Sequence, residues 1–514
     1  MMSGSTPWLT ILLLLPLLAA AAVAAMPSGD AERVKRVALA GSLVPLGVIV
    51  YLGMRFVSAS DGGSAFQFSE AHSWIPAFGV HYALGVDGVA LALMAMSAVL
   101  VPAAILAGWN DVEERGSGSV KEYFAWMLVL ETFIFGVFAA TDVFLFYVFF
   151  EAMLIPVYFL IGRFGGPRRV YAAVKFFLYS LLGGLVMLAS LIGLYVVSGQ
   201  QLSAPSFSLF DLVNLDLPAG TEKWLFLGFF LAFAIKAPLV PVHTWLPDAA
   251  EQGTPATTTL LVGVLDKVGT FGMLHLCLPL FPGASAWFAP TVLVLGVVGV
   301  IYGAIVAIGQ QDMRRLIAYT SVSHFGFIAI GVFAMTTLGQ SGASFYMVSH
   351  GFSTAALLLI AGFLISRRKS ARIEDFGGVQ KVAPVLAGLF LLSGLSALAL
   401  PGMSSFVSEF MVLQGVFQRH PAVAVVATLG IVLAAVYVLH MYRRTMTGPA
   451  TGPAASVRDL SGREVAAVAP LIALILALGF FPQPVLNLVN STSSWVMEHV
   501  GATDPQATVT KAGK

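Results

Sequence analysis

The chain alternates long apolar stretches with short polar connections along nearly its whole length. Runs of about 20 apolar residues, enough to cross a hydrocarbon core about 30 Å thick, recur almost without interruption. The pattern predicts an all-α integral membrane protein with about fourteen transmembrane helices, because a helix satisfies its own backbone groups in lipid. We number these segments 1 to 14 and place them at residues 8–26, 34–57, 84–108, 122–139, 142–162, 168–197, 224–246, 256–281, 287–309, 314–335, 343–366, 383–413, 421–442 and 465–488.

The first segment has two interpretations. Its alanine-rich end, AAAAVAAM, resembles the end of a signal peptide. No lysine or arginine precedes it, so the positively charged start of a signal peptide is missing. We therefore expect a retained transmembrane helix.

Two of the segments are interrupted by proline. Segment 7 carries Pro238, Pro241 and Pro247, and segment 12 carries Pro401 followed by Gly402. Proline lacks a backbone donor and clashes with the preceding helical turn, so both segments should break inside the membrane. Segments 4–8 and 9–13 are two blocks of five helices, each with the broken helix in fourth place. An odd block length inverts the second copy, which predicts two inverted repeats with an ion site at the breaks; the alternative is two unrelated kinks.

The interrupted repeats suggest three regions. Residues 1–119 hold helices 1–3, residues 120–445 hold the core of helices 4–13, and residues 446–514 hold a loop, helix 14 and a short tail.

Basic residues occur in the connections that follow odd-numbered segments. By the positive-inside rule these connections face the cytoplasm, which places both termini outside and requires an even number of helices. The basic residues concerned are Arg33, Lys35, Arg36, Arg163, Arg168, Arg169, Arg314, Arg315, Arg367, Arg368, Lys369, Arg372, Arg443, Arg444, Arg458 and Arg463.

The composition supports a membrane protein without a redox centre of its own. Apolar residues make up 58% of the chain and charged residues 10%, against about 25% charged in a soluble domain. A net charge of +1 without a basic block gives no sign of nucleic-acid binding. The single Cys277 excludes an internal disulfide and a cysteine-ligated cluster, and neither GxGxxG nor a Walker motif is present in the required context.

Four ionisable residues lie deep inside apolar segments: Glu151, Lys236, Lys267 and Glu409. A charge at the bilayer centre costs about 2.5–3.5 kcal/mol on insertion scales, so such residues usually serve a proton relay or an ion path. Glu151 and Lys236 are expected to pair; a static pair is the structural alternative, although buried pairs often contribute little stability.

Lys267 and Glu409 are expected to carry protons. Burial favours the neutral amine of Lys267, which lets it load and release a proton; the alternative is a lysine that reaches to the interface. Asp266 precedes it but projects about 100° away around the helix, so it need not be its partner. Glu409 follows the break of helix 12, where it mirrors Lys236, and could instead be a neutral acid bonded to the unwound backbone.

Histidines are candidates to connect these groups, because their ordinary pKa near 6.5 suits proton relay. His243 lies seven residues after Lys236, on the same face if the helix continues, and His324 and His350 lie within apolar segments. The alternative is a histidine that only bonds between helices. Two more charged residues, Lys175 and Glu131, are expected to tune the neighbouring groups or to line the water path.

Five sequence motifs carry a resemblance to a known family. FFEAMLIPVYFLIG, AIKAPLVPVHTWLPDAA, YTSVSHFGFIAIG, SHGFSTAALLLIAG and LPGMSSFVSEFMVLQG closely resemble the antiporter-like proton-channel family of respiratory complex I. The similarity covers roughly residues 120–445, and PxHxWLPDA after an AxKxP lysine is its most specific motif.

The resemblance implies roles for the buried charges. It assigns Glu151, Lys236, Lys267 and Glu409 to the half-channels and central axis of proton translocation. Several relatives have lysine where this chain has Glu409, which distinguishes one type of subunit within the family; His275 replaces a common arginine.

The resemblance also implies the surroundings of the chain. NADH, FMN, iron–sulfur clusters and quinone would be bound by partner subunits and no cofactor by this chain. The partners would be L- and N-type antiporter-like neighbours in a bacterial plasma membrane. Two other functions remain open: a subunit of a multi-subunit Mrp-type sodium/proton antiporter, and a membrane scaffold with static ion pairs.

Overall fold

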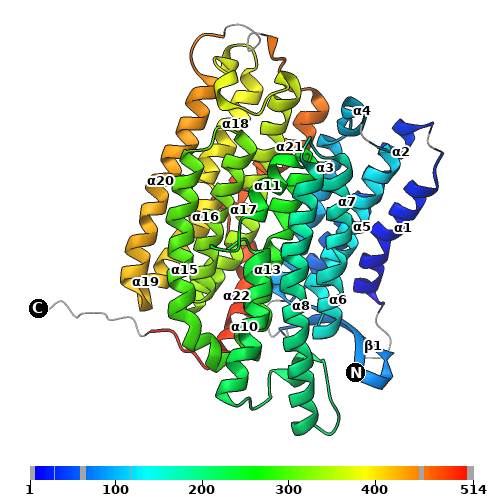
Figure 1. The fold of residues 1–514 in the computed structure, drawn as a ribbon, viewed down its shortest axis with the longest axis vertical. Coiled ribbons are helices and arrows are strands. Elements are labelled where there is room, and N and C mark those ends of the chain that lie inside the picture. The colour runs from blue at the N-terminus through cyan, green and yellow to red at the C-terminus, as the bar shows by residue number, and fades with distance from the viewer. Residues whose placement is uncertain (1–5, 28, 58–64, 117, 451–455, 506–514) are drawn as a thin grey trace, which may run out of the picture.

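The computed structural model describes residues 6–27, 29–57, 65–116, 118–450 and 456–505. Within these ranges twelve helices are long and apolar enough to cross a membrane, and they form one tall bundle (Figure 1). The predicted all-α membrane fold is confirmed. The predicted tail beyond residue 505 lies outside the described residues.

The helices follow the predicted segments closely. The spans that are continuous or only slightly interrupted are α1 (Trp8–Ala25), α2 (Ala31–Arg55), α3 (Gly88–Ala107), α5 (Val120–Ala139), α6 (Val143–Ala152) with α7 (Leu154–Phe164), α8 (Arg169–Gln201), α15 (Pro282–Ile308), α16 (Met313–Val332), α17 (Thr337–Arg368), α20 (Pro421–Met446) and α21 (Gly462–Phe480). Segment 8 forms a 26-residue rod, Pro255–Leu280, made of α12 (Pro255–Leu260), the π turn η3 (Leu261–Leu265), α13 (Lys267–Gly272), the π turn η4 (Met273–Cys277) and α14 (Leu278–Leu280).

The two predicted breaks are present. Segment 7 divides into α10 (Ala219–Lys236) and α11 (Trp245–Gln252), and segment 12 divides into α18 (Pro384–Ala397) and α19 (Ser404–Arg419). Lys236 is the last residue of α10. His243 lies in the turn between the two halves, so the helical spacing that would align it with Lys236 does not apply. The inverted relation of the two five-helix blocks stays a prediction.

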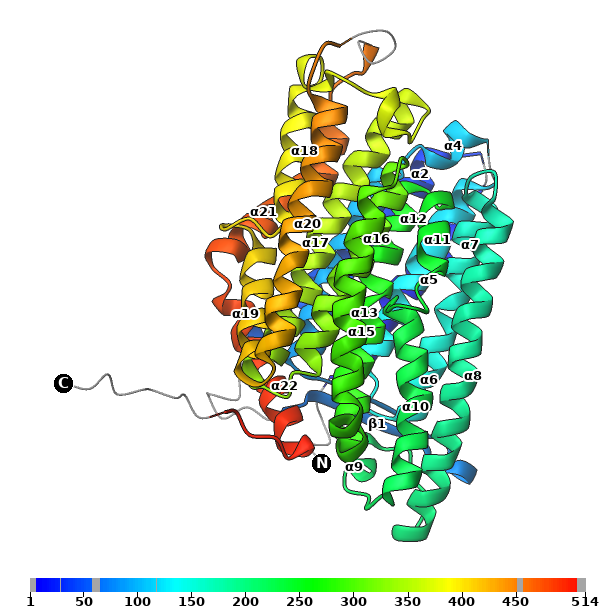
Figure 2. The ribbon, with the colours of Figure 1, turned by 60° about the vertical axis from the view of Figure 1, so that its left-hand side comes forward.

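The two ends of the bundle differ in character. One end, which we call the basic face, carries α4 (Asp111–Arg115), α11 and the first turns of α16 and α21 (Figure 1). The other end, which we call the hairpin face, carries the antiparallel strands β1 (Gln67–Ile75) and β2 (Val80–Val86) together with the short helix α9 (Leu209–Leu212) (Figure 2). The hairpin was not predicted. Its second strand occupies the predicted start of segment 3, and Asp87 then caps α3 by accepting a hydrogen bond from the backbone N–H of Ala90.

The last segment differs from its prediction. Helix α21 ends at Phe480, and a second helix, α22 (Gln483–Val500), follows after Pro482. A proline cannot supply the backbone donor that a continuous helix needs. Helix α22 packs on α3 so closely that a Cβ at Gly88 would meet the carbonyl oxygen of Leu488.

A loop on the basic face fixes the first half of segment 12. The carboxylate of Asp459 accepts hydrogen bonds of 2.9 Å from the backbone N–H groups of Val385 and Leu386 in the first turn of α18. Although partial desolvation acts in the opposite direction, these donors, the N–H of Leu460 and the positive field of Arg367 hold the pKa of Asp459 below its ordinary value. This anchor is therefore ionised at neutral pH.

Candidate functional site

Lys267 lies at the centre of the bundle in a fully buried polar cluster. Its amine donates to Asp266 Oδ1 at 2.9 Å and to the carbonyl oxygen of Val262, and it lies 2.7 Å from Nδ1 of His350. The side chains of Lys267 and Asp266 are both 0% exposed. The prediction of a buried lysine is confirmed in its placement. The geometric argument against Asp266 as its partner is wrong, because the long lysine side chain folds back along its own helix.

The backbone around Lys267 is irregular. The π turn Leu261–Leu265 precedes it and the π turn Met273–Cys277 follows it. A π turn holds one residue more than an α turn and frequently occurs at functional sites. The first π turn contains the carbonyl of Val262 that accepts from the lysine, so the irregularity provides one of the lysine's partners.

A row of polar side chains leads from Lys267 to Glu409. The rings of His350 and His324 are 5.2 Å apart, and Nε2 of His324 is 3.3 Å from the hydroxyl of Tyr437. The ring of Tyr346 lies 5.9 Å from that of His324, and the Tyr346 hydroxyl donates to Glu409 Oε2 at 3.3 Å. The structure thus brings Lys267, His350, His324 and Glu409 together, as four of the predicted residues. The two tyrosines were not predicted.

Buried serines line the contact between α17 and the broken segment 12. The hydroxyls of Ser349 and Ser408 are 2.9 Å apart, and that of Ser353 lies 2.5 Å from Ser396 and 3.0 Å from Ser405. All five side chains are at most 2% exposed. Serine is common in transmembrane helix contacts, so the sequence carried no signal that would have separated these five from the others.

Glu151 and Lys236 approach each other without forming an ion pair. The carboxylate lies against Gly184, where a Cβ would displace it. The amine of Lys236 lies 4.5 Å from the centre of the Phe150 ring and, within the described chain, has no hydrogen-bond partner. Lys236 is 1% exposed. The two charges are close enough to interact electrostatically, but their charged atoms lie beyond ion-pair distance.

Three other predicted residues lie outside this row. His243 packs between the rings of Tyr302 and Tyr319, at 5.2 and 6.2 Å. Lys175 forms an ion pair with Asp248 at 2.7 Å, nearer the basic face. Glu131 is 0% exposed, and neither of its carboxylate oxygens has a hydrogen-bond partner among the described residues.

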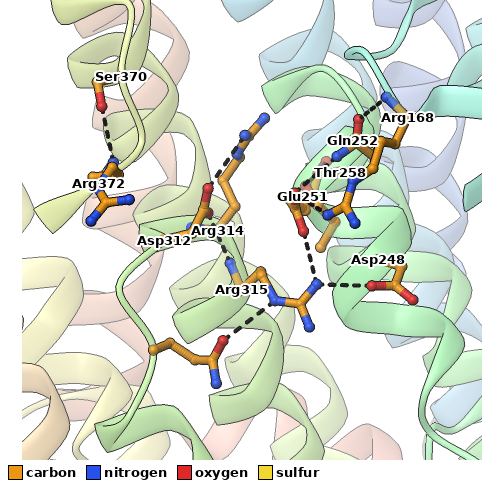
Figure 3. Close-up of polar contacts among 12 residues, drawn as sticks. Arg168, Asp248, Glu251, Gln252, Thr258, Asp312, Arg314, Arg315, Ser370 and Arg372 are labelled. Carbon is orange, nitrogen blue, oxygen red and sulfur yellow. Dashed lines mark hydrogen bonds and ion pairs between the residues drawn. The ribbon is translucent and has the colours of Figure 1, made fainter.

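An ion network joins three helices at the basic face (Figure 3). The guanidinium of Arg315 in α16 donates to Asp248 and Glu251 of α11, both at 2.8 Å. Glu251 also pairs with Arg168 at 2.7 Å, and Asp248 pairs with Lys175 of α8. The network therefore fixes the second half of broken segment 7 to helices on either side of it.

Replacing Arg315 with alanine should destabilise the basic face. The change leaves two partly buried carboxylates without their shared partner, which we expect to cost about 1–3 kcal/mol. Thermal unfolding of the purified assembly, followed by the loss of α-helical circular dichroism, measures the change. The matched variant Arg372→Ala, in an exposed pair with Glu374, should leave the unfolding midpoint unchanged. Equal midpoints for both variants would show that the ion network around Arg315 does not stabilise the basic face.

Known proteins share both the sequence and the fold. A family model for the NADH:quinone oxidoreductase/Mrp antiporter transmembrane region matches residues 140–434. NADH-quinone oxidoreductase subunit M of Mycobacterium tuberculosis is 49% identical over 538 aligned residues, which cover 98% of this chain and 97% of the relative. The chain belongs to the subunit M family of NADH-quinone oxidoreductase.

Solved structures agree with this membership. A chain of respiratory complex I from Thermus thermophilus with bound NADH superimposes with a TM-score of 0.87 and 30% identity, covering 96% of this chain and 100% of that one. A chain of the Mrp complex from a Dietzia species has a TM-score of 0.80, with 96% and 99% covered, but only 22% identity, so it shows the shared fold alone. The family resemblance predicted from the motifs is confirmed, and the Mrp alternative is less supported. Within the residues that the structure describes, no cluster of histidine, cysteine or acidic side chains is arranged to hold a metal ion.

Proposed function

We propose that this chain carries protons across a bacterial plasma membrane as one antiporter-like subunit of a respiratory complex I. The observation that carries the proposal is the buried row from Lys267 through His350, His324 and Tyr346 to Glu409. Each member of the row can accept or donate a proton, and the row runs from the first five-helix block to the second.

Lys236 and Glu151 would act as the switch at the start of this path. Two buried charges that are close but not paired change each other's proton affinity strongly, because the surrounding medium screens little. Protonation of Glu151 removes the negative field that helps Lys236 to keep its proton. Lys236 then releases that proton toward the next group.

Lys267 would receive the proton and pass it along the row. The backbone beside the break of segment 7 approaches the rod at Gly269, where a Cβ would lie 2.5 Å from the backbone N of Ala237. This close packing supports transfer from the helix end that carries Lys236 to the segment that carries Lys267. From there the proton moves to His350 and His324, and Tyr346 delivers it to Glu409.

The basic face would be cytoplasmic, because the short basic connections lie there. The hairpin face and both termini would then lie outside. The redox chemistry belongs to partner subunits: the curated relatives are named NADH-quinone oxidoreductases, and we expect NADH, FMN, iron–sulfur clusters and quinone in those partners. Neighbouring L- and N-type subunits would continue the membrane arm.

Purification of the intact complex separates this function from the Mrp alternative. We expect the complex to oxidise NADH with a quinone acceptor and, in sealed vesicles, to acidify the interior without added sodium. Sodium-stimulated proton exchange in vesicles that lack NADH would favour the antiporter instead. Full pumping after neutralisation of all four buried charges would favour a scaffold.

A further inference from the structure

Glu131 is a buried carboxyl that lies outside the row of polar groups from Lys267 to Glu409. Its side chain is 0% exposed, whereas Ala125, Trp126 and Val129 of the same helix are only half-buried. Burying an unpaired carboxylate is costly, and such a group inside a membrane is a functional candidate by default. Its neighbours along α5 and along the Pro255–Leu280 rod show what it could serve.

Two contacts fix how α5 lies beside the rod. The hydroxyl of Tyr123 is 2.6 Å from that of Thr254, and the ring of Phe138 is 5.1 Å from that of Phe271. Interpolation between them places Glu131 level with Gly263, within the π turn Leu261–Leu265. Seven residues separate Glu131 from Phe138, so on an α-helix the two point within about 20° of each other. Glu131 therefore faces the rod.

The same π turn holds the amine of Lys267. Lys267 donates to the carbonyl oxygen of Val262, so the amine has folded back to the level of Glu131. The carboxyl approaches the rod from α5, whereas His350 and Phe325 contact the amine from α17 and α16. A π turn disturbs the regular backbone ladder, where a water molecule can insert.

A chain of hydroxyls leads toward Glu131 from the basic face. Thr254 donates to the hydroxyl of Thr257 at 2.9 Å, and the Tyr123 hydroxyl lies 2.6 Å from Thr254. All three side chains are at most 2% exposed. Thr259 lies two residues further along the rod, and its buried hydroxyl has no partner in the described part of the chain. Hydroxyls both accept and donate, so such a chain passes a proton without moving its heavy atoms.

A cavity of about 480 Å³ opens at the foot of this hydroxyl chain. Its walls include Pro255, which follows Thr254 directly. They carry both acidic and basic side chains: Asp111, Glu114, Glu251, Arg168, Arg314 and Lys369. The cavity, the hydroxyls and the carboxyl thus follow one another from the basic face inward.

We propose that Glu131 is the proton carrier of an inlet that loads Lys267 from the basic face. A proton that enters at the cavity passes along Tyr123, Thr254 and Thr257 and, through water, converts the Glu131 carboxylate to the acid. Transfer from that acid to the neutral amine of Lys267, through water at the π turn, gives the ammonium and restores the carboxylate. The inlet rests on the proposed function, because it needs Lys267 to be a proton station, and it supplies Lys267 in addition to the transfer from Lys236.

Inverted membrane vesicles that contain the intact complex test the inlet, because the proposed cytoplasmic face then meets the bath. Glu131→Gln is expected to slow NADH-driven acidification at least about tenfold, as loss of a proton-transfer group does. Lowering the bath pH by one unit increases the proton supply tenfold and should restore much of the rate. Its matched control is Glu222→Gln: the Glu222 carboxylate is also buried, but it accepts from the backbone N–H of Ala284 near the hairpin face, and this variant should pump at the parent rate.

Two further variants make the outcome unambiguous. Thr257→Val should slow pumping several-fold, whereas Thr445→Val, whose hydroxyl bonds only within α20, should not; this pair decides the matter if Glu131→Gln does not assemble. If Thr257→Val pumps at the parent rate, the inlet is overturned. The inlet alone is also overturned if Glu131→Gln pumps at the parent rate while Lys267→Ala fails to pump. A slow Glu131→Gln that does not respond to bath pH also overturns it. Normal pumping by Lys267→Ala overturns the proposed function of that residue instead.

Discussion

Replacing Lys236 with alanine is expected to stop proton pumping while the complex still assembles. The amine has no hydrogen-bond partner in the described chain and lies over the Phe150 ring. Its removal therefore breaks no bond, and it also removes the cost of keeping a charge in the membrane. We expect NADH-driven acidification of vesicles to fall at least about tenfold, because a proton-transfer group is lost. Native gel electrophoresis checks that assembly is unchanged.

Lys223→Ala is the matched control for this variant. Lys223 belongs to the same helix, α10, but lies at the hairpin face with its amine 4.0 Å from the centre of the Trp287 ring. The same substitution there should leave pumping unchanged. If Lys236→Ala pumped at the parent rate, Lys236 would have no part in proton transfer.

Glu409→Gln should block the far end of the row. Glutamine keeps the size of the side chain and an oxygen that accepts from the Tyr346 hydroxyl, but it cannot take up a proton at neutral pH. The local structure should therefore survive, while NADH-driven acidification falls at least about tenfold. Glu409→Asp retains a carboxyl one methylene further from Tyr346 and should retain part of the rate.

The comparison of these two variants separates proton transfer from packing. If packing alone mattered, glutamine would be tolerated better than aspartate, because it preserves the volume of the buried side chain. If the carboxyl carries protons, the order is reversed. Glu222→Gln again serves as the control for the loss of a buried carboxyl elsewhere. A parent rate for Glu409→Gln would remove Glu409 from the path.

The spans were predictable because the length of an apolar run maps directly onto the thickness of a membrane. The breaks were predictable because proline acts on its own backbone: α10 ends at Lys236, and α18 ends at Ala397, four residues before Pro401. The functional importance of the buried charges was predictable because a charge inside the membrane costs free energy. Each of these inferences depends on a local property of the sequence.

Features that depend on contacts between distant segments were not predictable. Tyr437 joins the row only because α20 passes His324. The spacing of residues along the chain does not predict a contact between segments so far apart. The pairing of Asp266 with Lys267 was missed because the long lysine side chain folds back along its own helix. That Glu151 and Lys236 form no ion pair depends on the exact placement of the two side chains, which a sequence pattern does not resolve.

The buried serines between α17 and the two halves of segment 12 bear on the direction of transport. In the contacts of Ser349 with Ser408, and of Ser353 with Ser396 and Ser405, either hydroxyl can be the donor. Hydroxyl pairs of this kind exchange the donor and acceptor roles at little cost, so they impose no direction on a proton. Any one-way character of the protein must therefore come from the order in which its charged ends, Lys267 and Glu409, change their protonation.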